Sequence, residues 1–341
     1  MMKAFYAVEQ KQHNPKAFLS SGAPQPNPEQ PERTERLLLG AKAAGCAIER
    51  PREHGRGPIA AIHTPEYLDF LEHIYTRWQR IEGASEEVIP NIHPLGRNGR
   101  YPASAVGQAG YHMADTACPI SAETWDSACW SAWSAVEASE AVMSGAPAAY
   151  ALSRPPGHHA FADAAGGFCF FNNSAIAAQH LRKQAARVAI LDVDLHHGNG
   201  TQGIFYARPD VLTVSIHADP VRFYPFFWGH ADERGEGQGL GYNLNLPLPR
   251  KSGDEAFLEA LQPAFRRIRA FAPDALVVAL GLDAFEGDPF GGLSVSTPGF
   301  ARMAEAISSL GLPSIIVQEG GYLCDALSDN LTAFLTGYAS Q

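Results

Sequence analysis

Short apolar runs alternate along the chain with longer stretches in which apolar residues recur every three or four positions. The runs are rich in β-branched residues, which is typical of buried strands, whereas the longer stretches have the period of helices. The runs predicted to form strands are Ala4–Val8, Ala148–Leu152, Val188–Leu191, Val211–Ile216, Ala275–Leu280 and Ser314–Val317. The stretches predicted to form helices are Glu32–Ala44, Pro65–Trp78, Trp125–Ser144, Asn173–Gln184, Asp254–Ala272 and Pro298–Leu310.

The predicted strands are apolar along their whole length, so other elements must cover both of their faces. Helices lie between the strands in sequence, which favours a parallel sheet with a layer of helices on each face. The sequence therefore predicts an α/β fold with one doubly wound parallel sheet, in a single domain spanning residues 1–341. Thr124 and the Thr297-Pro298 pair are expected to begin two of the helices.

Composition and charge exclude several classes of protein. The chain has 341 residues, 45% hydrophobic and 18% charged, which is typical of a globular protein rather than a disordered one. With 26 basic and 36 acidic residues, it lacks the positive charge expected of a nucleic-acid-binding protein. The start is not apolar and no apolar run approaches the ~18 residues of a membrane span, so no membrane partner is expected. Five cysteines without a Cys-x-x-Cys pair favour reduced thiols and a cytoplasmic location.

The segment Gly83–Tyr101 interrupts the alternation of strands and helices. It contains prolines, glycines and charges of both signs, together with Val88, Ile89, Ile92 and Leu95. Long segments without periodicity are either plain surface loops or functional insertions. The first interpretation makes it a surface loop, and the second an insertion that caps a site or contacts a second subunit.

Titratable residues follow four of the predicted strands directly, at the carboxyl end of each. The segments concerned are Arg154–His159, Asp192–Gly200, Gly281–Asp283 and Glu319–Tyr322. Ligands of open α/β sheets bind outside the carboxyl ends of the strands. We therefore expect these four segments to contribute to one functional site.

Two of these segments have the residue types of a catalytic metal site. Asp194 and His196 are two positions apart, so at an extended strand end they project to the same side, and Asp283 would be a third ligand. Three such ligands leave a coordination position open for water and suit Zn²⁺, Fe²⁺ or Co²⁺. The alternative is a buried ion pair between Asp194 and His196, although the nearby Asp192 and Asn199 favour the metal site.

His158 and His159 follow a Pro-Pro-Gly turn and could flank a water molecule bound to the metal. Asp192 beside one imidazole would favour its charged form, and Asn199 beside the other would favour its neutral form. The alternative is a solvated pair of histidines. Tyr322 could donate a hydrogen bond to a developing oxyanion, or could simply pack in the core.

The five motifs Arg154–His159, Gly166–Asn173, Asp192–Gly200, Gly281–Asp283 and Glu319–Tyr322 resemble those of the histone deacetylase and acetylpolyamine amidohydrolase superfamily. The chain length, the insertion, Trp125 and the motif Thr201–Tyr206 make it most similar to the acetylpolyamine amidohydrolase branch. The resemblance implies the arginase–deacetylase fold and a structural role for potassium beside a catalytic zinc.

The resemblance also implies a role for each site residue. Zinc would be bound by Asp194, His196 and Asp283. His159 would be the general base and acid, supported by Asn199, while His158 with Asp192 would be its electrostatic partner and Tyr322 would polarise the carbonyl. The substrate tunnel would be formed by Gly167, Phe168 and Tyr224. One potassium site would use the side chains of Asp192 and Ser215 and the carbonyls of Asp192, Asp194, His196 and Ile216, and a second the carbonyls of Phe205, Arg208, Val211 and Tyr242.

One departure from the family concerns the far end of the substrate. Some members use acidic residues near the insertion to hold the distal ammonium of a polyamine. The corresponding stretch here has Val106 and Ala117, with Asp115 as the nearby acid and candidate substrate-binding residue. A short acetylated diamine is therefore expected to fit better than a long polycation.

The expected function is zinc-dependent removal of acetyl groups from N-acetylated polyamines or diamines, such as acetylputrescine or acetylcadaverine, by attack of a zinc-bound water. The partners expected are this small-molecule substrate and a second copy bound through residues 83–101. A protein lysine deacetylase is the alternative. A ureohydrolase needs a second metal, and Gly198 and Phe285 cannot provide its ligands. A non-catalytic metal-dependent module would be expected to lack the base or the tyrosine.

Overall fold

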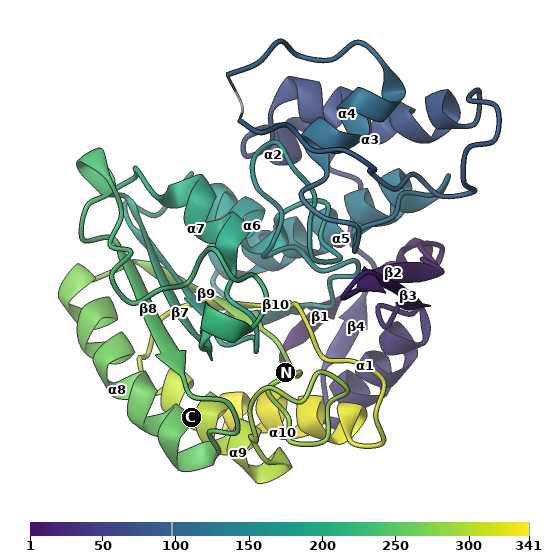
Figure 1. Cartoon of the computed structure of the whole chain (residues 1–341). Coiled ribbons are helices and arrows are strands. Elements are labelled where there is room, and N and C mark those ends of the chain that lie inside the picture. Colours follow the sequence, from purple (N-terminus) through teal and green to yellow (C-terminus); the bar gives the residue numbers. More distant parts are fainter. Residues whose placement is uncertain (97, 341) are drawn as a thin grey trace.

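The computed structural model describes residues 1–96 and 98–340. Its centre is an eight-stranded sheet in the order β4-β1-β5-β10-β9-β6-β7-β8 (Figure 1), and all neighbouring strands are parallel. The strands are β1 (Lys3–Phe5), β4 (Ala47–Glu49), β5 (Ala148–Ala151), β6 (Val188–Asp192), β7 (Val211–Ala218), β8 (Asn243–Leu248), β9 (Ala275–Leu280) and β10 (Ser314–Gln318). The predicted doubly wound α/β fold is confirmed.

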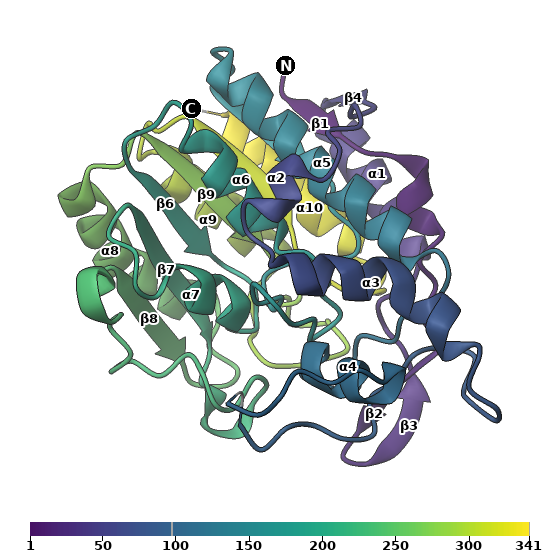
Figure 2. The same ribbon diagram turned by 90° about the horizontal axis from the view of Figure 1, so that it is seen from above.

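Helices cover both faces of the sheet. One face is covered by α5 (Thr124–Met143) and α6 (Asn173–Leu181), with α3 (Pro65–Trp78) further from the sheet on the same side (Figure 1). The opposite face is covered by α1 (Glu32–Ala43), α8 (Asp254–Phe271), α9 (Thr297–Ser308) and α10 (Leu327–Ala339) (Figures 1 and 2). Alternate side chains of each strand enter alternate cores: Ile315 and Val317 pack with the first layer, and Ile316 with the second. This burial on both faces is the reason that the strands are continuously apolar.

The six predicted strands are present, with one large difference at an end. The run Ala4–Val8 forms a strand only to Phe5, because Val8–Lys11 turns into a 3₁₀ helix. The edge strands of the sheet, β4 and β8, were not predicted from the sequence. A separate antiparallel hairpin of β2 (Ala17–Ser20) and β3 (Ala23–Pro26) was not predicted either. Edge strands are only partly covered, so they lack the apolar run on which the prediction depended.

The six predicted helices are also present, and α3 has the predicted ends. Helix α9 is capped one residue earlier than expected, because the Ser296 hydroxyl accepts from the Gly299 amide at 3.1 Å. Three helices, α2 (Gly57–Ala60), α4 (Ala105–His112) and α7 (Asn199–Phe205), were not predicted because they are too short for a periodic signal, and no range was predicted for α10.

The insertion at residues 83–101 is anchored at one end and exposed in its middle. Val88 is fully buried and pairs with Ile120 through two backbone hydrogen bonds, so this end of the insertion belongs to the core and is not available to a second subunit. Val88 packs in the core shared with α3 and α5 because that contact removes its side chain from water. Ile92 and Leu95 do project outward, and the side chain of Leu95 is fully exposed.

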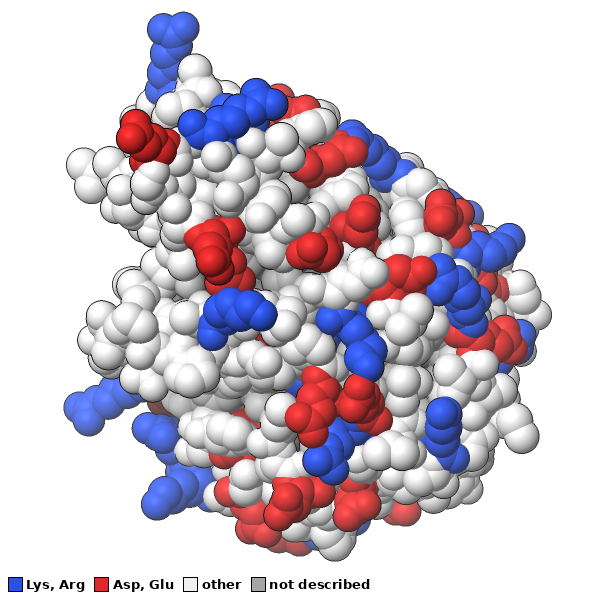
Figure 3. All heavy atoms as spheres, turned by 90° about the vertical axis from the view of Figure 1, so that its right-hand side faces the viewer, with Lys and Arg blue, Asp and Glu red and all other residues white. Residues whose placement is uncertain are grey.

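The surface charges are mixed rather than gathered by sign. On the face drawn in Figure 3, acidic and basic side chains lie side by side, without a continuous basic stripe. No helix among residues 1–96 and 98–340 is long and apolar enough to cross a membrane. All five cysteines are free thiols.

Candidate active site

The four strands that lead into the predicted site lie next to one another at the centre of the sheet. Their order is β5-β10-β9-β6, and they are parallel, so all four carboxyl ends meet at one edge. The segments that follow them are far apart in sequence, from residue 154 to residue 322. The arrangement therefore brings the four titratable segments together, as expected for a ligand site of an open α/β sheet.

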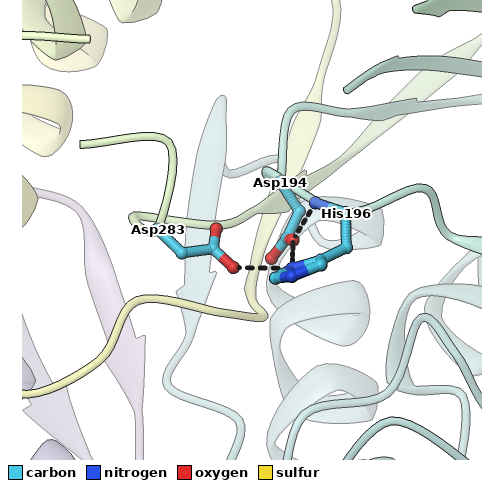
Figure 4. A group of neighbouring side chains, drawn as sticks. All are labelled: Asp194, His196 and Asp283. Carbon is cyan, nitrogen blue, oxygen red and sulfur yellow. Dashed lines mark hydrogen bonds and ion pairs between the residues drawn. The ribbon is translucent and has the colours of Figure 1, made fainter. Parts of the chain in front are cut away.

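Asp194, His196 and Asp283 form a buried group whose ligand atoms all lie within 4.8 Å of one another (Figure 4). The His196 Nδ1 lies 3.0 Å from Asp283 Oδ2 and 3.3 Å from Asp194 Oδ1. Asp194 and His196 follow β6, and Asp283 follows the adjacent strand β9. Two carboxylates and one imidazole are a suitable donor set for a catalytic divalent metal.

Backbone amides hold the two carboxylates of this group in place. Asp194 Oδ2 accepts from the Gly320 amide at 2.8 Å, and Asp283 Oδ1 accepts from the Leu195 amide at 3.1 Å. A Cβ atom at Gly320 would lie 2.3 Å from Asp283 Oδ2, so only glycine fits at this position. The glycine after β10 thus lets a third strand end approach the ligand group.

The electrostatics of this group also fit a divalent cation. Burial alone would raise the pKa of Asp194, but the positive charges of His158 and His196 hold it well below its usual range. Burial and the charge of Asp194 raise the pKa of Asp283. Burial disfavours the charged form of His196, yet Asp194 and Asp283 outweigh it and raise the pKa to about 9. The two carboxylates thus attract positive charge, which a metal ion would supply in place of the imidazole proton.

The two histidines have different partners. His158 Nδ1 lies 2.9 Å from Asp192 Oδ2, and His159 Nδ1 lies 2.7 Å from Asn199 Oδ1. Burial opposes protonation of both, but the charges of Asp194 and Asp192 raise the pKa of His158 to about 10. Burial and the neighbouring positive charges of His158 and His196 hold the pKa of His159 well below its usual range. These surroundings favour the charged form of His158 and the neutral form of His159.

Tyr322 lines a cavity beside the metal-ligand group and is held in place by residues that were not among the predicted site residues. Its amide donates to Asp288 Oδ2 at 2.9 Å, and the Arg33 guanidinium lies 4.9 Å from the centre of its ring. Arg33 also donates to the carbonyls of Glu319 and Gly321, at 2.7 and 2.6 Å. Burial raises the pKa of the Tyr322 hydroxyl well above its usual value, so this group remains a hydrogen-bond donor.

A buried ion network supports Arg33. The carboxylate of Glu29 accepts from Arg33 at 2.7 Å and from Arg154 at 2.8 Å, and none of the three side chains is exposed. Charged residues are almost never fully buried unless they are paired, so only the tertiary contacts show that these three side chains are buried. The proximity of Arg154 to the His158-His159 motif was the one available signal.

The metal-ligand group lies beside a cavity of about 620 Å³ with largely aromatic walls, and His196 lines that cavity. Gly167, Phe168 and Tyr224, which the sequence analysis assigned to the tunnel, all line it. The other aromatic residues of the wall were not predicted; they are Phe18, Phe161, Phe223, Phe226, Phe227, Trp228 and Phe290. The aromatic run from 223 to 228 was a usable signal, because such residues are unusual in an exposed loop.

Asp115 lies at this cavity and supports its wall. Its Oδ2 accepts from the Tyr224 hydroxyl at 2.7 Å and from the Gly167 amide at 3.0 Å, and its Oδ1 accepts from the Ala117 amide at 2.8 Å. Ala117 lines the cavity, whereas Val106 does not. The described residues of 83–101 do not line the cavity within a single chain.

The residues assigned to potassium lie beside β6, α7 and β7. Asp192 and Ser215 are directly opposite each other in the sheet and border a small void of about 10 Å³. Ile216 and Val211 lie on β7, Phe205 ends α7, and Arg208 and Tyr242 lie on the connecting loops. The carbonyls of Phe205 and Tyr242 already accept from the amides of Arg208 and Thr213, at 2.9 and 3.0 Å.

Comparison with known proteins gives one consistent result. The family model described as histone deacetylase domain matches residues 27–338. The chain is 48% identical to an acetylpolyamine amidohydrolase of Burkholderia pseudomallei over 340 residues, and 40% identical to one of Mycoplana ramosa over 341 residues, covering at least 99% of each chain. It matches a crystal structure titled as acetylpolyamine aminohydrolase from Burkholderia pseudomallei with a TM-score of 0.97, at 48% identity, covering 100% of this chain and 99% of the other.

A more distant solved structure, the HDA15 HD domain, matches at 29% identity with a TM-score of 0.81, covering 99% of this chain and 90% of the other. The relatives indicate a deacetylase of the hydrolase class, and zinc dependence is typical of this family. The buried Asp194, His196 and Asp283 are consistent with that dependence. The chain belongs to the histone deacetylase family.

Proposed function

We propose that this protein hydrolyses the amide bond of N-acetylated diamines and polyamines, releasing acetate and the free amine. The observation that carries the proposal is the buried group of Asp194, His196 and Asp283 at an aromatic cavity which His159 and Tyr322 also line. Full-length similarity to several acetylpolyamine amidohydrolases supports the substrate class.

Asp194, His196 and Asp283 would hold one divalent ion, for which zinc is the first candidate and iron(II) or cobalt(II) the alternatives. When bound, such an ion supplies Lewis acidity toward water and toward the amide carbonyl. The positions that would hold a second ion in a ureohydrolase are Gly198 and Phe285, so one catalytic ion per chain is expected.

The protein residues would then transfer protons and stabilise the charge that develops in the reaction. Asn199 accepts from His159 Nδ1, which leaves Nε2 as the basic nitrogen to take a proton from water and return it to the leaving amine. His158, charged and paired with Asp192, would stabilise negative charge in the transition state. The Tyr322 hydroxyl would donate to the carbonyl oxygen as it becomes negative.

Three further assignments complete the proposal. Structural potassium would lie near Asp192 and Ser215, and a second potassium near Phe205, Arg208, Val211 and Tyr242. A homodimer would form through the exposed part of residues 83–101, where Ile92 and Leu95 project outward. Five free cysteines fit a reducing compartment, which favours the cytoplasm.

Acetate release from acetylputrescine, acetylcadaverine, acetylspermidine and an acetyl-lysine peptide tests the proposed substrate class. We expect the short acetylated diamines to have a higher kcat/KM than the peptide. A peptide cleaved as well as acetylputrescine would instead favour the protein lysine deacetylase. No acetate from any of the four, with metal bound, would contradict the deacetylase mechanism itself.

A further inference from the structure

The charges that line the cavity are unusual for a protein that is to bind a polycation. Among the described residues of the lining, Asp115 provides a carboxylate and Arg222 a guanidinium. Arg222 is exposed, and the structure shows no ion pair or hydrogen bond of its side chain with a described residue. A free arginine at the cavity is therefore available to a ligand.

Arg222 and Asp115 border the same cavity, and Tyr224 relates the two segments that carry them. Arg222 ends a short 3₁₀ helix (Pro220–Arg222), and Tyr224, two positions further on, lines the cavity as well. The Tyr224 hydroxyl donates to Asp115 at 2.7 Å. Arg222 and Asp115 form no salt bridge with each other, so the two charges at the cavity are not neutralised by direct pairing.

We propose that Arg222 and Asp115 together bind the head group of a free amino acid, so that the protein also deacetylates ω-N-acetylated α,ω-diamino acids such as Nε-acetyl-L-lysine. This inference rests on the proposed hydrolysis of acetylated amines. The acetamide would enter past Phe168 and Tyr224, Asp115 would accept from the α-ammonium, and Arg222 would donate to the α-carboxylate. Arginine suits this role because its planar fork matches a carboxylate.

The same two charges disfavour a polyamine. A single distal ammonium can pair with Asp115, but a second ammonium, as in acetylspermidine, would meet the positive charge of Arg222 with no carboxylate to offset it. Repulsive contacts of this kind contribute to specificity as much as attractive ones. A substrate that carries a carboxylate beside its distal ammonium should therefore bind better than one that carries a second ammonium.

One matched pair of substrates isolates Arg222. Nε-acetyl-L-lysine and acetylcadaverine have the same chain and ammonium, and differ in the carboxylate. Arg222→Gln should lower kcat/KM for Nε-acetyl-L-lysine by about fivefold, as expected for an exposed charge-assisted contact. The same variant should raise kcat/KM for acetylcadaverine and acetylspermidine, because it removes a repulsive charge.

The control variant is Arg266→Gln on α8, which makes the same change of charge at an exposed arginine outside the cavity lining. This variant should leave kcat/KM unchanged for Nε-acetyl-L-lysine, acetylcadaverine and acetylspermidine. Nε-acetyl-D-lysine and an Nα-blocked acetyl-L-lysine should both be cleaved more slowly than the L amino acid, because each loses one of the two charged contacts.

Failure of the inference is distinguishable from failure of the proposed function. Wild-type protein that cleaves acetylcadaverine but not Nε-acetyl-L-lysine would overturn the inference and leave the proposed function standing. An equal loss for both substrates in Arg222→Gln, or no change for either, would also overturn it. No acetate from any substrate would contradict the proposed function.

Discussion

At the scale of single residues, His159 and Tyr322 reach the cavity from the ends of different strands, β5 and β10. Neither belongs to the group of Asp194, His196 and Asp283, so each can be changed without removing a ligand atom. Their contribution to the reaction is therefore separable from metal binding.

His159→Ala should lower kcat by about 10²–10⁴-fold, and Tyr322→Phe by about 10²–10³-fold, because they remove a general base and an oxyanion donor. The measurement is kcat for acetylputrescine together with the metal content of each purified variant. Activity restored by excess zinc would show instead that these residues act by retaining the metal.

A different histidine is expected to make the fold sensitive to acid. His63 is buried, its Nε2 accepts from the Asn172 amide at 2.9 Å, and burial lowers its pKa to about 4. Below the unfolded pKa of about 6.5, the unfolded chain binds a proton that the folded chain does not, so stability falls as pH falls from about 6.5 to 4. Between pH 7 and pH 5 this residue should cost about 2 kcal/mol of the free energy of unfolding.

His63→Gln tests this prediction, because glutamine keeps an acceptor and does not titrate. Urea unfolding at pH 7 and pH 5 should show a smaller loss of stability on acidification in the variant than in the wild type. If acidification lowered the free energy of unfolding equally in the two proteins, His63 would be excluded as the source of the acid sensitivity.

At the scale of elements, the catalytic loop after β10 depends on a contact from α1. Arg33 lies on α1, donates to the carbonyls of Glu319 and Gly321, and pairs with Glu29. A lysine has a single ammonium and cannot make these contacts at once, so Arg33→Lys leaves buried acceptors without donors.

We expect Arg33→Lys to lower the free energy of unfolding by about 2–4 kcal/mol, and to lower kcat because the loop that holds Tyr322 loses its support. Urea unfolding and kcat measure the two effects. Arg36→Lys is the matched control, since Arg36 lies on the same helix, is exposed and pairs with Glu32. A loss as large for Arg36→Lys as for Arg33→Lys would contradict the role of the buried network.

At the scale of the whole molecule, residues 83–101 have two distinct parts. The part around Val88 belongs to the core, whereas Ile92 and Leu95 expose apolar surface. Only the second part is available to another chain, and removing the whole segment would also remove a core residue. The dimer is therefore best tested by substitution at the exposed positions.

The double variant Ile92→Glu, Leu95→Glu should be monomeric in analytical ultracentrifugation, because two carboxylates would have to be desolvated at the interface. It should also gain activity on acetyl-lysine peptides relative to acetylputrescine if the partner narrows the mouth. Leu240→Glu, at another exposed leucine, is the control and should retain the oligomeric state of the wild type. A double variant that stays dimeric with the same substrate ranking would refute both expectations.

The apolar pattern was enough to predict the six inner strands of the sheet, six of the helices and the strand ends that carry the chemistry. The central strands are buried on both faces, so their apolar runs are visible without any tertiary information. Asp194 and His196 could be paired from their spacing alone, since residues two apart in an extended segment share a side. Family motifs were needed to assign a role to each histidine.

Features that depend on contacts between distant segments could be seen only in the folded protein. The trio of Glu29, Arg33 and Arg154 joins residues up to 125 positions apart, and nothing in its local sequence separates it from an exposed set of charges. Val88 is a core residue only because Ile120 pairs with it. Likewise, Arg222 becomes a candidate binding residue only because its loop returns to the wall where Tyr224 meets Asp115. The local pattern of apolar residues predicts which positions are buried and which elements form. Which distant charged residues pair with each other depends on how those elements pack in the folded chain.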